Sequence, residues 1–220
     1  MTQDAAGGPN PSNPLQGTAD WIRERIGCLT ASRMADAMDF LKNGNSSAAR
    51  TKLMRGLLAE RLVNAAMDHY VTPAMEWGLA HEAGARDRYE AISGNLVQLV
   101  GFVPHRSIEW FGASPDGFID DDGLVEIKCP TTPAYIAWRT ASVVPEEYKP
   151  QMLAQLSCTR RKFCDFVAFD PRVKERRLQL FVRRFTPVEA EIAEVEIRAI
   201  QFLRELDSMF DAFHAKEAHD

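Results

Sequence analysis

The chain has 220 residues, 45% of them hydrophobic and 26% charged, and its formal net charge of −5 is weak evidence against a nucleic-acid partner, because phosphate contacts require cations. This length suffices for one well-packed domain and is too short for two ordinary ones, and the composition is that of a soluble globular protein. No apolar stretch approaches the roughly 18–20 residues of a membrane-spanning helix, and no basic segment followed by an apolar one opens the chain, so we expect a cytoplasmic protein without membrane contact.

The first part of the chain is predicted to be helical. Residues 1–17 are rich in Gly, Pro, Asn and Gln and are expected to be a disordered lead-in to a single domain over residues 18–220. Helical character begins at Asp20, and Thr30 or Ser32 is placed to cap a helix over about 31–41. After a loop at 42–47, two longer helices are predicted over 48–70 and over about 73–92.

The centre of the chain changes to short runs rich in aromatic and β-branched residues, which predict strands. These strands are expected over 96–102, 106–111, 114–119 and 123–129. Two helices follow over 133–141 and 146–159, then two strands over 165–169 and 177–185, and finally a long helix over 187–215. Strands in the centre with helices before and after them predict an α/β fold, with a central mixed sheet flanked by helices.

Four cysteines, Cys28, Cys129, Cys158 and Cys164, are scattered along the chain without a C-x-x-C pair. This spacing argues against a zinc site, a disulfide framework and an iron-sulfur cluster. We therefore expect ordinary reduced thiols.

The segment over residues 114–130, S-P-D-G-F-I-D-D-D-G-L-V-E-I-K-C-P, carries the most informative motif. Because alternate residues of a strand share a face, Glu126 and Lys128 are predicted to point the same way, about 6.6 Å apart along the chain. The Asp-rich turn favours a hairpin-like reversal that returns Asp116 beside Glu126. Two acids and one cation are therefore expected to converge.

This arrangement is typical of a metal-dependent site that cleaves phosphodiesters. Mg²⁺ prefers oxygen ligands and keeps several waters, so two carboxylates, one backbone carbonyl and phosphate oxygens suffice to hold it. Such an ion polarises the phosphoryl group and activates water. Lys128 is placed to orient that water, to help deprotonate it if its pKa is lowered, or to offset charge in the transition state. A motif match is only a hypothesis until its structural context is known. The alternative interpretation of this segment is a surface hairpin with a solvated Glu-x-Lys pair.

The segment W-I-R-E-R-I-G-C-L-T-A-S contains a candidate phosphate site. Arg23 and Arg25 are suited to bind a phosphate, since a guanidinium can form two parallel hydrogen bonds with it. The hydroxyls of Thr30 and Ser32 at a helix start add donors. An ordinary helix cap beside solvated arginines is the simpler explanation of the local sequence.

Two predicted helices carry further candidates. In M-E-W-G-L-A-H-E-A-G-A-R, Glu82 is placed to ligate a metal or orient its water. Taken alone, an exposed helix charge paired with Arg86 is the simpler description of this residue. In Y-K-P-Q-M-L-A-Q-L, Gln151 is placed to hydrogen-bond the attacking water or a phosphate oxygen. Gln151 and Gln155 lie one helical turn apart, and two such glutamines are usually solvated.

Together the motifs resemble the phage lambda exonuclease group, or YqaJ-type viral recombinases, within the PD-(D/E)xK nuclease superfamily. The resemblance spans residues 21–174 in consistent order, through W-I-R-E-R-I-G-C-L-T-A-S, E-W-G-L-A-H-E-A-G-A-R, A-S-P-D-G, L-V-E-I-K-C-P, Q-M-L-A-Q-L and F-D-P-R-V-K. It implies a restriction-endonuclease-like central sheet. It also implies a 5'-to-3' exonuclease that degrades one strand of linear duplex DNA to mononucleotides and leaves a 3' single strand for recombination by strand annealing.

The resemblance also assigns roles to residues. It implies one or two Mg²⁺ ions, with Mn²⁺ as a substitute. In this family the positions of Asp116, Glu126 and the Ile127 carbonyl hold the metal, and that of Lys128 acts on the nucleophilic water. The remaining matches are the helix-borne acid Glu82, the glutamine Gln151 beside the site, and Arg25 and Ser32, with Thr30 nearby, around the terminal 5'-phosphate.

Family members assemble as a ring-shaped trimer around DNA, so the resemblance implies a homotrimer whose basic residues line the channel. It further implies a single-strand annealing protein as a partner, and a phage or prophage origin with action in the cytoplasm of a bacterial host.

The sequence departs from the family upstream of Ser-Pro-Asp, where a shorter segment offers only Glu109 in place of another active-site acid. Two alternatives stay open. One is a different nuclease of the superfamily, which cuts internally or processes single strands. The other is a non-catalytic DNA-end clamp or recombination scaffold.

Overall fold

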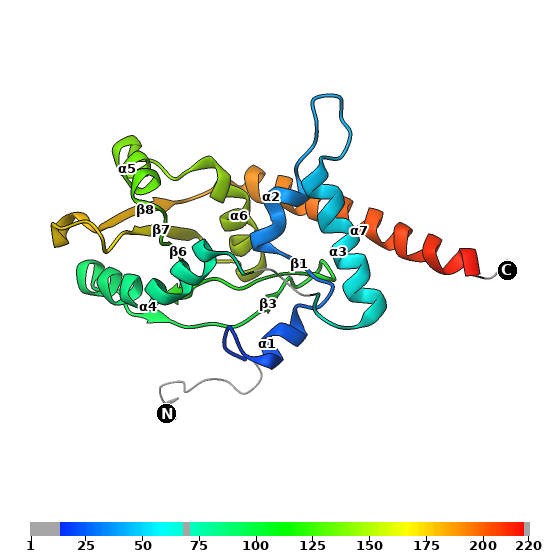
Figure 1. Cartoon of the computed structure of the whole chain (residues 1–220), viewed down its shortest axis with the longest axis horizontal. Helices are drawn as coiled ribbons and strands as arrows, with labels where there is room; N and C mark the ends of the chain where they lie inside the picture. Colours follow the sequence, from blue (N-terminus) through cyan, green and yellow to red (C-terminus); the bar gives the residue numbers. More distant parts are fainter. Residues whose placement is uncertain (1–13, 68–70, 218–220) are drawn as a thin grey trace.

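The computed structural model describes residues 14–67 and 71–217 (Figure 1). Most of the predicted lead-in, residues 1–13, lies outside the described residues. In the remaining part of it, Gln16 Nε2 donates a hydrogen bond of 2.7 Å to the Pro115 carbonyl. No helix within the described ranges is long and apolar enough to cross a membrane.

A five-stranded mixed sheet forms the centre of the fold, in the order β2-β5-β6-β7-β8. β6 and β7 are parallel and the other neighbours are antiparallel. The strands are β2 (Val97–Gln98), β5 (Gly117–Ile119), β6 (Gly123–Lys128), β7 (Phe163–Phe169) and β8 (Leu180–Phe185). The predicted α/β fold with a central mixed sheet flanked by helices is therefore confirmed.

Helices cover both faces of this sheet. Successive side chains of β6 point to opposite faces, and both faces are buried. Val125 and Ile127 pack with residues of α4 (Pro73–Ser93). Leu124 packs on the other face with residues of α5 (Thr132–Ala141) and α6 (Lys149–Thr159). Glu126 and Lys128 share the face of Leu124, as the strand period predicts.

A second, smaller sheet lies beside the first, in the order β1-β4-β3. It consists of β1 (Leu29–Thr30), β3 (Val103–Pro104) and β4 (Phe111–Ala113), and α1 (Ala19–Glu24) precedes it in the chain. A hydrophobic cluster joins β1 and β4 to α3 (Ala48–Val63), α6 and α7 (Glu189–Glu217). The last turns of α7 extend away from the body of the molecule (Figure 1).

The helix predicted over 31–41 is confirmed only over 31–37, as two short pieces. Leu29 and Thr30 pair in parallel with β4, and only a 3-10 turn (Ala31–Arg33) and the four-residue helix α2 (Met34–Ala37) follow. The chain then forms a small hairpin closed by a bridge between Phe40 and Ser46. This hairpin, in which the Ser47 N–H also donates to the Asp39 carbonyl, takes the place of the last turn of the predicted helix.

Several other predicted boundaries need correction. The helix predicted over 48–70 ends at Val63, where Asn64 adopts a left-handed conformation with φ of 52°, and residues 68–70 are not among those described. The run 96–102 forms only β2, and the run 106–111 is a turn that enters a strand at Phe111 because His105 Nδ1 accepts hydrogen bonds from two backbone N–H groups. The strand predicted over 177–185 begins at Leu180, after a 3-10 turn (Arg176–Leu178).

Candidate active site

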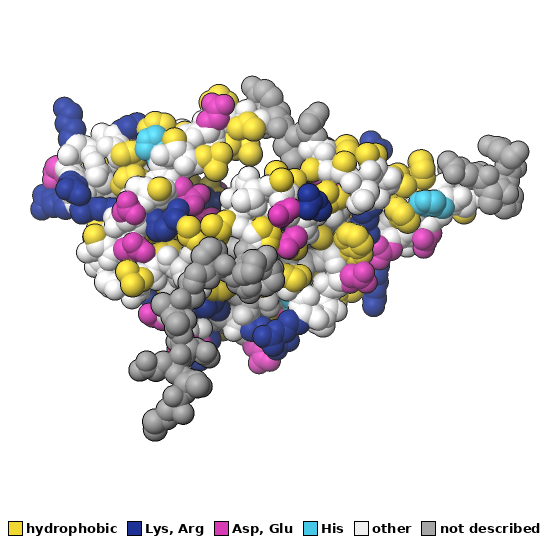
Figure 2. Space-filling model, turned by 90° about the horizontal axis from the view of Figure 1, so that it is seen from below, with side chains coloured by type: hydrophobic (Ala, Val, Ile, Leu, Met, Phe, Trp, Pro, Cys, Tyr) yellow, Lys and Arg dark blue, Asp and Glu magenta, His cyan; other side chains and the backbone are white. Residues whose placement is uncertain are grey.

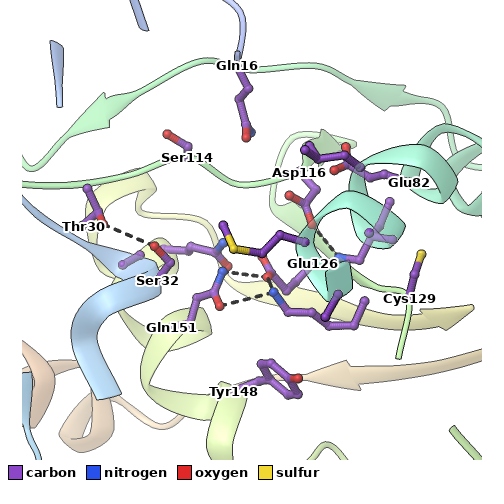
Figure 3. Close-up of a pocket in the computed structure, with 18 of the residues that line it drawn as sticks. Gln16, Thr30, Ser32, Glu82, Ser114, Asp116, Glu126, Cys129, Tyr148 and Gln151 are labelled. Carbon is purple, nitrogen blue, oxygen red and sulfur yellow. Dashed lines mark hydrogen bonds and ion pairs between the residues drawn. The ribbon is translucent and has the colours of Figure 1, made fainter. Parts of the chain in front are cut away.

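A cavity of about 520 Å³ between α4, α6 and the two sheets collects nearly all the predicted site residues (Figure 3). Its lining includes Arg25, Thr30, Ser32, Glu82, Asp116, Glu126, Ile127, Lys128 and Gln151. Glu109 lies instead in an exposed turn and does not line the cavity. The structure thus gives no support to Glu109 as a further active-site acid.

The hairpin of β5 and β6 brings Asp116 to Glu126. Gly117 pairs with Val125 in antiparallel register, so Asp116, the residue before Gly117, lies opposite Glu126. The Ile127 backbone N–H donates a hydrogen bond of 2.6 Å to Asp116 Oδ2, which fixes the carboxylate against the strand. The Asp-rich turn therefore has the predicted effect.

Glu126 is the centre of the polar network and only 1% exposed. Its Oε1 lies 2.6 Å from Lys128 Nζ and accepts a hydrogen bond of 2.6 Å from Gln151 Nε2. Its Oε2 accepts a hydrogen bond of 2.6 Å from Gln155 Nε2. Gln155 is thus fully buried rather than solvated. The spacing of Gln151 and Gln155 by one helical turn indicates that both lie on one face of α6. That this face contacts Glu126 follows only from the packing of α6 on β6.

Lys128 is held between Glu126 and the ring of Tyr148, whose centroid lies 5.1 Å from Nζ. Burial by itself would lower the pKa of Lys128, but the carboxylates of Glu126 and Asp116 outweigh it and raise the pKa above its ordinary value. Lys128 is therefore protonated in this arrangement. Of its three predicted roles, orienting water and offsetting charge fit better than deprotonating water.

Two acids of the cavity, Asp116 and Glu82, resist ionisation because their pKa values are raised. Burial raises the pKa of Asp116 well above its ordinary value, the Glu126 carboxylate raises it further, and Lys128 opposes the shift. Burial also raises the pKa of Glu82, against the opposing charge of Arg86. The three carboxyl groups of Asp116, Glu126 and Glu82 outnumber their two paired cations, Lys128 and Arg86. A divalent cation would relieve the remaining negative charge.

The donor set fits a hard cation such as Mg²⁺. Asp116, Glu126 and Ile127 line one cavity and offer carboxylate and carbonyl oxygens, the ligands that Mg²⁺ prefers. Within residues 14–67 and 71–217, no three His, Cys, Asp or Glu side chains form a metal-holding group. A site built here would therefore draw its remaining ligands from water and phosphate, as Mg²⁺ sites commonly do.

Arg25 reaches the cavity from the turn that follows α1. Its guanidinium carbon lies 3.8 Å from the centroid of the Trp21 ring, and Trp21 Nε1 donates a hydrogen bond of 3.0 Å to Ser114 Oγ. Arg25 Nε is buried and has no hydrogen-bond partner among the described residues. Burial lowers the pKa of Arg25. Trp21 and Ser114 were not predicted as site residues, because the hydrogen bond between them depends on tertiary packing.

The hydroxyl pair predicted beside Arg25 is present but does not cap a helix. Thr30 Oγ1 lies 3.3 Å from Ser32 Oγ, and Thr30 makes no capping hydrogen bond although it precedes the 3-10 turn. Both hydroxyls line the cavity. The turn leading to them requires Gly27, which has φ of +70° and whose added Cβ would lie 2.6 Å from the Arg61 side chain.

Glu82 is half-buried rather than an exposed helix charge, and its predicted role at a metal stays a prediction. Its Oε1 lies 3.2 Å from Arg86 Nη2, the helix pair expected of a plain surface charge. It also lines the cavity, on the side of Asp116 (Figure 3). The neighbouring His81 stacks on Trp77 and plays no part in the cavity lining.

Comparisons with known proteins agree with the fold. The sequence pattern of the YqaJ-like viral recombinase domain matches residues 20–162. The crystal structure of an alkaline exonuclease (LHK-Exo) from Laribacter hongkongensis is 38% identical, with a TM-score of 0.84, over 91% of this chain and 98% of that chain. The complex of LHK-Exo with dAMP matches equally well.

A phage related exonuclease from Haemophilus somnus 129PT is 13% identical, with a TM-score of 0.63, over 84% of this chain and 96% of that chain, and shows a shared fold. None of the curated proteins compared with the chain matches it.

Proposed function

This chain belongs to the YqaJ-like viral recombinase family, and on that premise we propose that it is a Mg²⁺-dependent 5'-to-3' exonuclease acting on linear double-stranded DNA. It would degrade one strand to mononucleotides and leave a 3' overhang for recombination by strand annealing. The observation that carries the proposal is the convergence of Asp116, Glu126 and Lys128 on one cavity. The similarity to an alkaline exonuclease over nearly the whole chain supports it.

Asp116, Glu126 and the Ile127 carbonyl would hold the metal. When bound, Mg²⁺ supplies polarisation of the scissile phosphate and activation of a water molecule. Lys128 keeps its proton beside Glu126 and donates to the phosphate oxygens as negative charge develops on them. Gln151, 3.5 Å from Lys128 Nζ through its Oε1, is placed to orient the attacking water. Glu82 lines the same cavity and would accept a hydrogen bond from water there.

We assign the selection of a DNA end to Arg25, Thr30 and Ser32, which line the cavity together with the proposed metal ligands. Stacking on Trp21 holds the Arg25 guanidinium, whose Nε lacks a hydrogen-bond partner among the described residues. The hydroxyls of Thr30 and Ser32 add donors for phosphate oxygens. A terminal 5'-phosphate held there would set the scissile bond next to Lys128 and favour cleavage from the end of a strand.

The direct test uses linear and closed circular duplex DNA labelled on one strand. With Mg²⁺, we expect labelled mononucleotides from linear DNA, starting at the 5' end, and an intact circle. Chelation with EDTA should stop the reaction, and Mn²⁺ should restore it. Cutting of the circle would instead identify an internal nuclease, and binding of ends without release of nucleotides would identify a DNA-end clamp.

We also propose that the protein works as a homotrimeric ring on DNA, together with a single-strand annealing protein that coats the spared strand. Both proposals rest on membership of the family. A ring would retain the DNA between successive cleavages.

A further inference from the structure

We propose that Gln155 is a positioning residue that fixes Glu126 for metal binding, an inference that rests on the proposed function. Gln155 lies on α6, and its side chain is completely buried. Its Nε2 donates a hydrogen bond of 2.6 Å to Oε2 of Glu126, which is also buried. The contact therefore joins two enclosed groups away from competing solvent, where a hydrogen bond to a charged acceptor is strong.

The rest of the Gln155 side chain has no evident structural purpose. Its Oε1 is buried and has no hydrogen-bond partner among the described residues. Leaving an amide oxygen buried without a donor destabilises the fold, whereas an apolar side chain would avoid this cost. Its neighbours Met152 and Leu156 on α6 are apolar and buried. A polar group that breaks the local packing rule is expected where function requires it, and the hydrogen bond to Glu126 identifies that requirement.

The two oxygens of Glu126 are held differently. Oε1 contacts Lys128 Nζ and Gln151 Nε2, whose side chains are only partly buried. Oε2 contacts Gln155, which is completely enclosed. Oε2 is therefore held by the enclosed amide of Gln155, and Oε1 is the oxygen that can exchange its present partners for a cation.

This division separates the roles of the two glutamines. Gln155 touches Glu126 and fixes the rotation of its carboxylate, whereas Gln151 also reaches Lys128 at the open side of the cavity. Hydrogen bonds to ligating side chains typically change metal affinity by about 10–100-fold. Loss of Gln155 should consequently act on metal affinity, and loss of Gln151 should act mainly on turnover with saturating metal.

The test is Gln155→Met, which preserves side-chain length and removes the donor. Binding of Mn²⁺ to the full-length protein without DNA is measured from the electron paramagnetic resonance signal of free Mn²⁺. We expect the dissociation constant to rise by about 10–100-fold. The Mg²⁺ concentration for half-maximal nuclease activity should rise in parallel, while kcat at saturating Mg²⁺ falls less than it does in Gln151→Met.

Ser157→Ala is the matched control. It removes a hydrogen bond of 2.7 Å from the same helix to Glu196, outside the cavity, so Mn²⁺ affinity should not change. If circular dichroism shows that Gln155→Met does not fold, Gln155→Asn keeps the amide but withdraws it from Glu126, and the same loss of affinity is expected.

An unchanged Mn²⁺ dissociation constant in a folded Gln155 variant would overturn the positioning role while leaving the proposed nuclease intact. A wild-type protein that neither binds Mn²⁺ nor degrades DNA would overturn the proposed function and this inference together.

Discussion

The ammonium group of Lys128 lies between a buried carboxylate and an aromatic ring, and the proposed chemistry depends on its charge. Lys128→Met keeps most of the side-chain volume and removes the donor. We expect hydrolysis to fall by about 10²–10³-fold, as for loss of one donor to a developing oxyanion, while DNA binding with Mg²⁺ persists. Single-turnover rates and binding measured in parallel separate the two effects.

Lys162→Met is the matched control, because Lys162 is 73% exposed and pairs only with Asp122 among the described residues. Comparable losses of activity in both variants would show that Lys128 has no special role.

Arg25 is the residue assigned to the 5'-phosphate. Arg25→Ala should abolish the preference for 5'-phosphorylated over 5'-hydroxyl ends, because the cavity then lacks the planar group that matches phosphate geometry. The measurement is the ratio of initial rates on the two substrates. Arg23→Ala is a suitable control, since Arg23 is 72% exposed and pairs with Asp20. Equal slowing of both substrates in Arg25→Ala would contradict the assignment.

Asp116 links metal binding to stability. Its pKa is raised by burial and by Glu126, so the metal-free folded chain binds a proton more tightly than the unfolded chain. The free energy of unfolding should then fall as the pH rises from about 4 through the folded pKa, and Mg²⁺ should offset that loss. In Asp116→Asn this pH dependence should be much weaker.

Calorimetry at pH 8 tests this directly. In EDTA, Asp116→Asn should melt a few degrees above the wild type, where about 2–4 °C corresponds to 1 kcal/mol in a chain of this size. Mg²⁺ should raise the melting temperature of the wild type only. A variant that melts below the wild type in EDTA would show that the ionised Asp116 carboxylate does not destabilise the fold.

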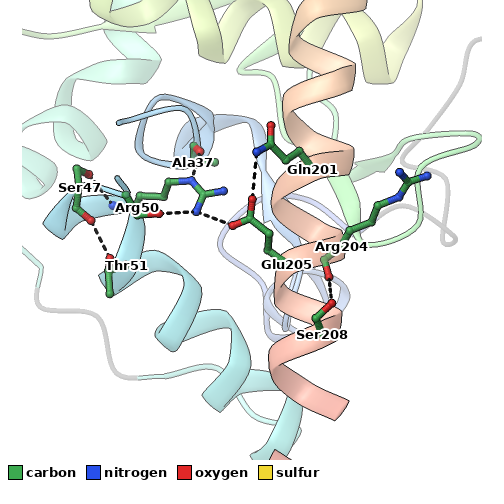
Figure 4. A network of polar contacts seen from close by, with 9 residues as sticks. Ala37, Ser47, Arg50, Thr51, Gln201, Arg204, Glu205 and Ser208 are labelled. Carbon is green, nitrogen blue, oxygen red and sulfur yellow. Dashed lines mark hydrogen bonds and ion pairs between the residues drawn. The ribbon is translucent and has the colours of Figure 1, made fainter. Parts of the chain in front are cut away.

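At the scale of elements, Arg50 connects three parts of the chain (Figure 4). It lies on α3 and is only 2% exposed. Its Nε donates a hydrogen bond of 3.0 Å to the Ala37 carbonyl, its Nη1 donates one of 2.9 Å to Ser46 Oγ, and its Nη1 lies 2.9 Å from Glu205 on α7. The hairpin after α2 is thus fastened to both helices by one side chain.

Arg50→Met should lower the free energy of unfolding by about 2–4 kcal/mol, because it leaves the Ala37 carbonyl without its donor and separates the hairpin from α7. Glu205 keeps partial access to water, which moderates the loss. Arg204→Met is the control: Arg204 is exposed and points away from the network (Figure 4), so its loss should cost under about 0.5 kcal/mol. Urea unfolding curves measure both values.

The elements also show what local sequence can and cannot predict. β6, α5, α6 and α7 were predicted because alternation, turn residues and long helical periodicity are local signals. The helix predicted over 31–41 stops at Ala37, because the chain then turns into a hairpin closed by Phe40 and Ser46, a contact that the local pattern does not contain. The same limit applies to the site. Asp116, Glu126 and Lys128 lie on one hairpin and could be grouped from spacing, whereas Trp21, Ser114 and Gln155 contribute only through tertiary packing.

At the scale of the whole molecule, the charge distribution raises the question of how an acidic chain binds DNA. On the face shown in Figure 2, Lys and Arg side chains are interspersed with Asp and Glu. With a net charge of −5, nonspecific attraction to DNA is weak, and phosphate contacts must be concentrated where several basic groups meet. A closed ring would bring basic groups together, because the same surface of each copy would face one duplex.

The proposed ring predicts both a mass and a kinetic property. Light scattering should give three times the chain mass of 24.7 kDa, at concentrations where the enzyme is active. Once loaded, a ring need not release DNA between cleavages, so excess unlabelled competitor DNA added after the start should leave the degradation of bound substrate almost unchanged. Moderate salt should inhibit loading more than later cleavage, since long-range attraction is screened. A monomeric mass, with immediate arrest by competitor DNA, would show that the chain acts without encircling its substrate.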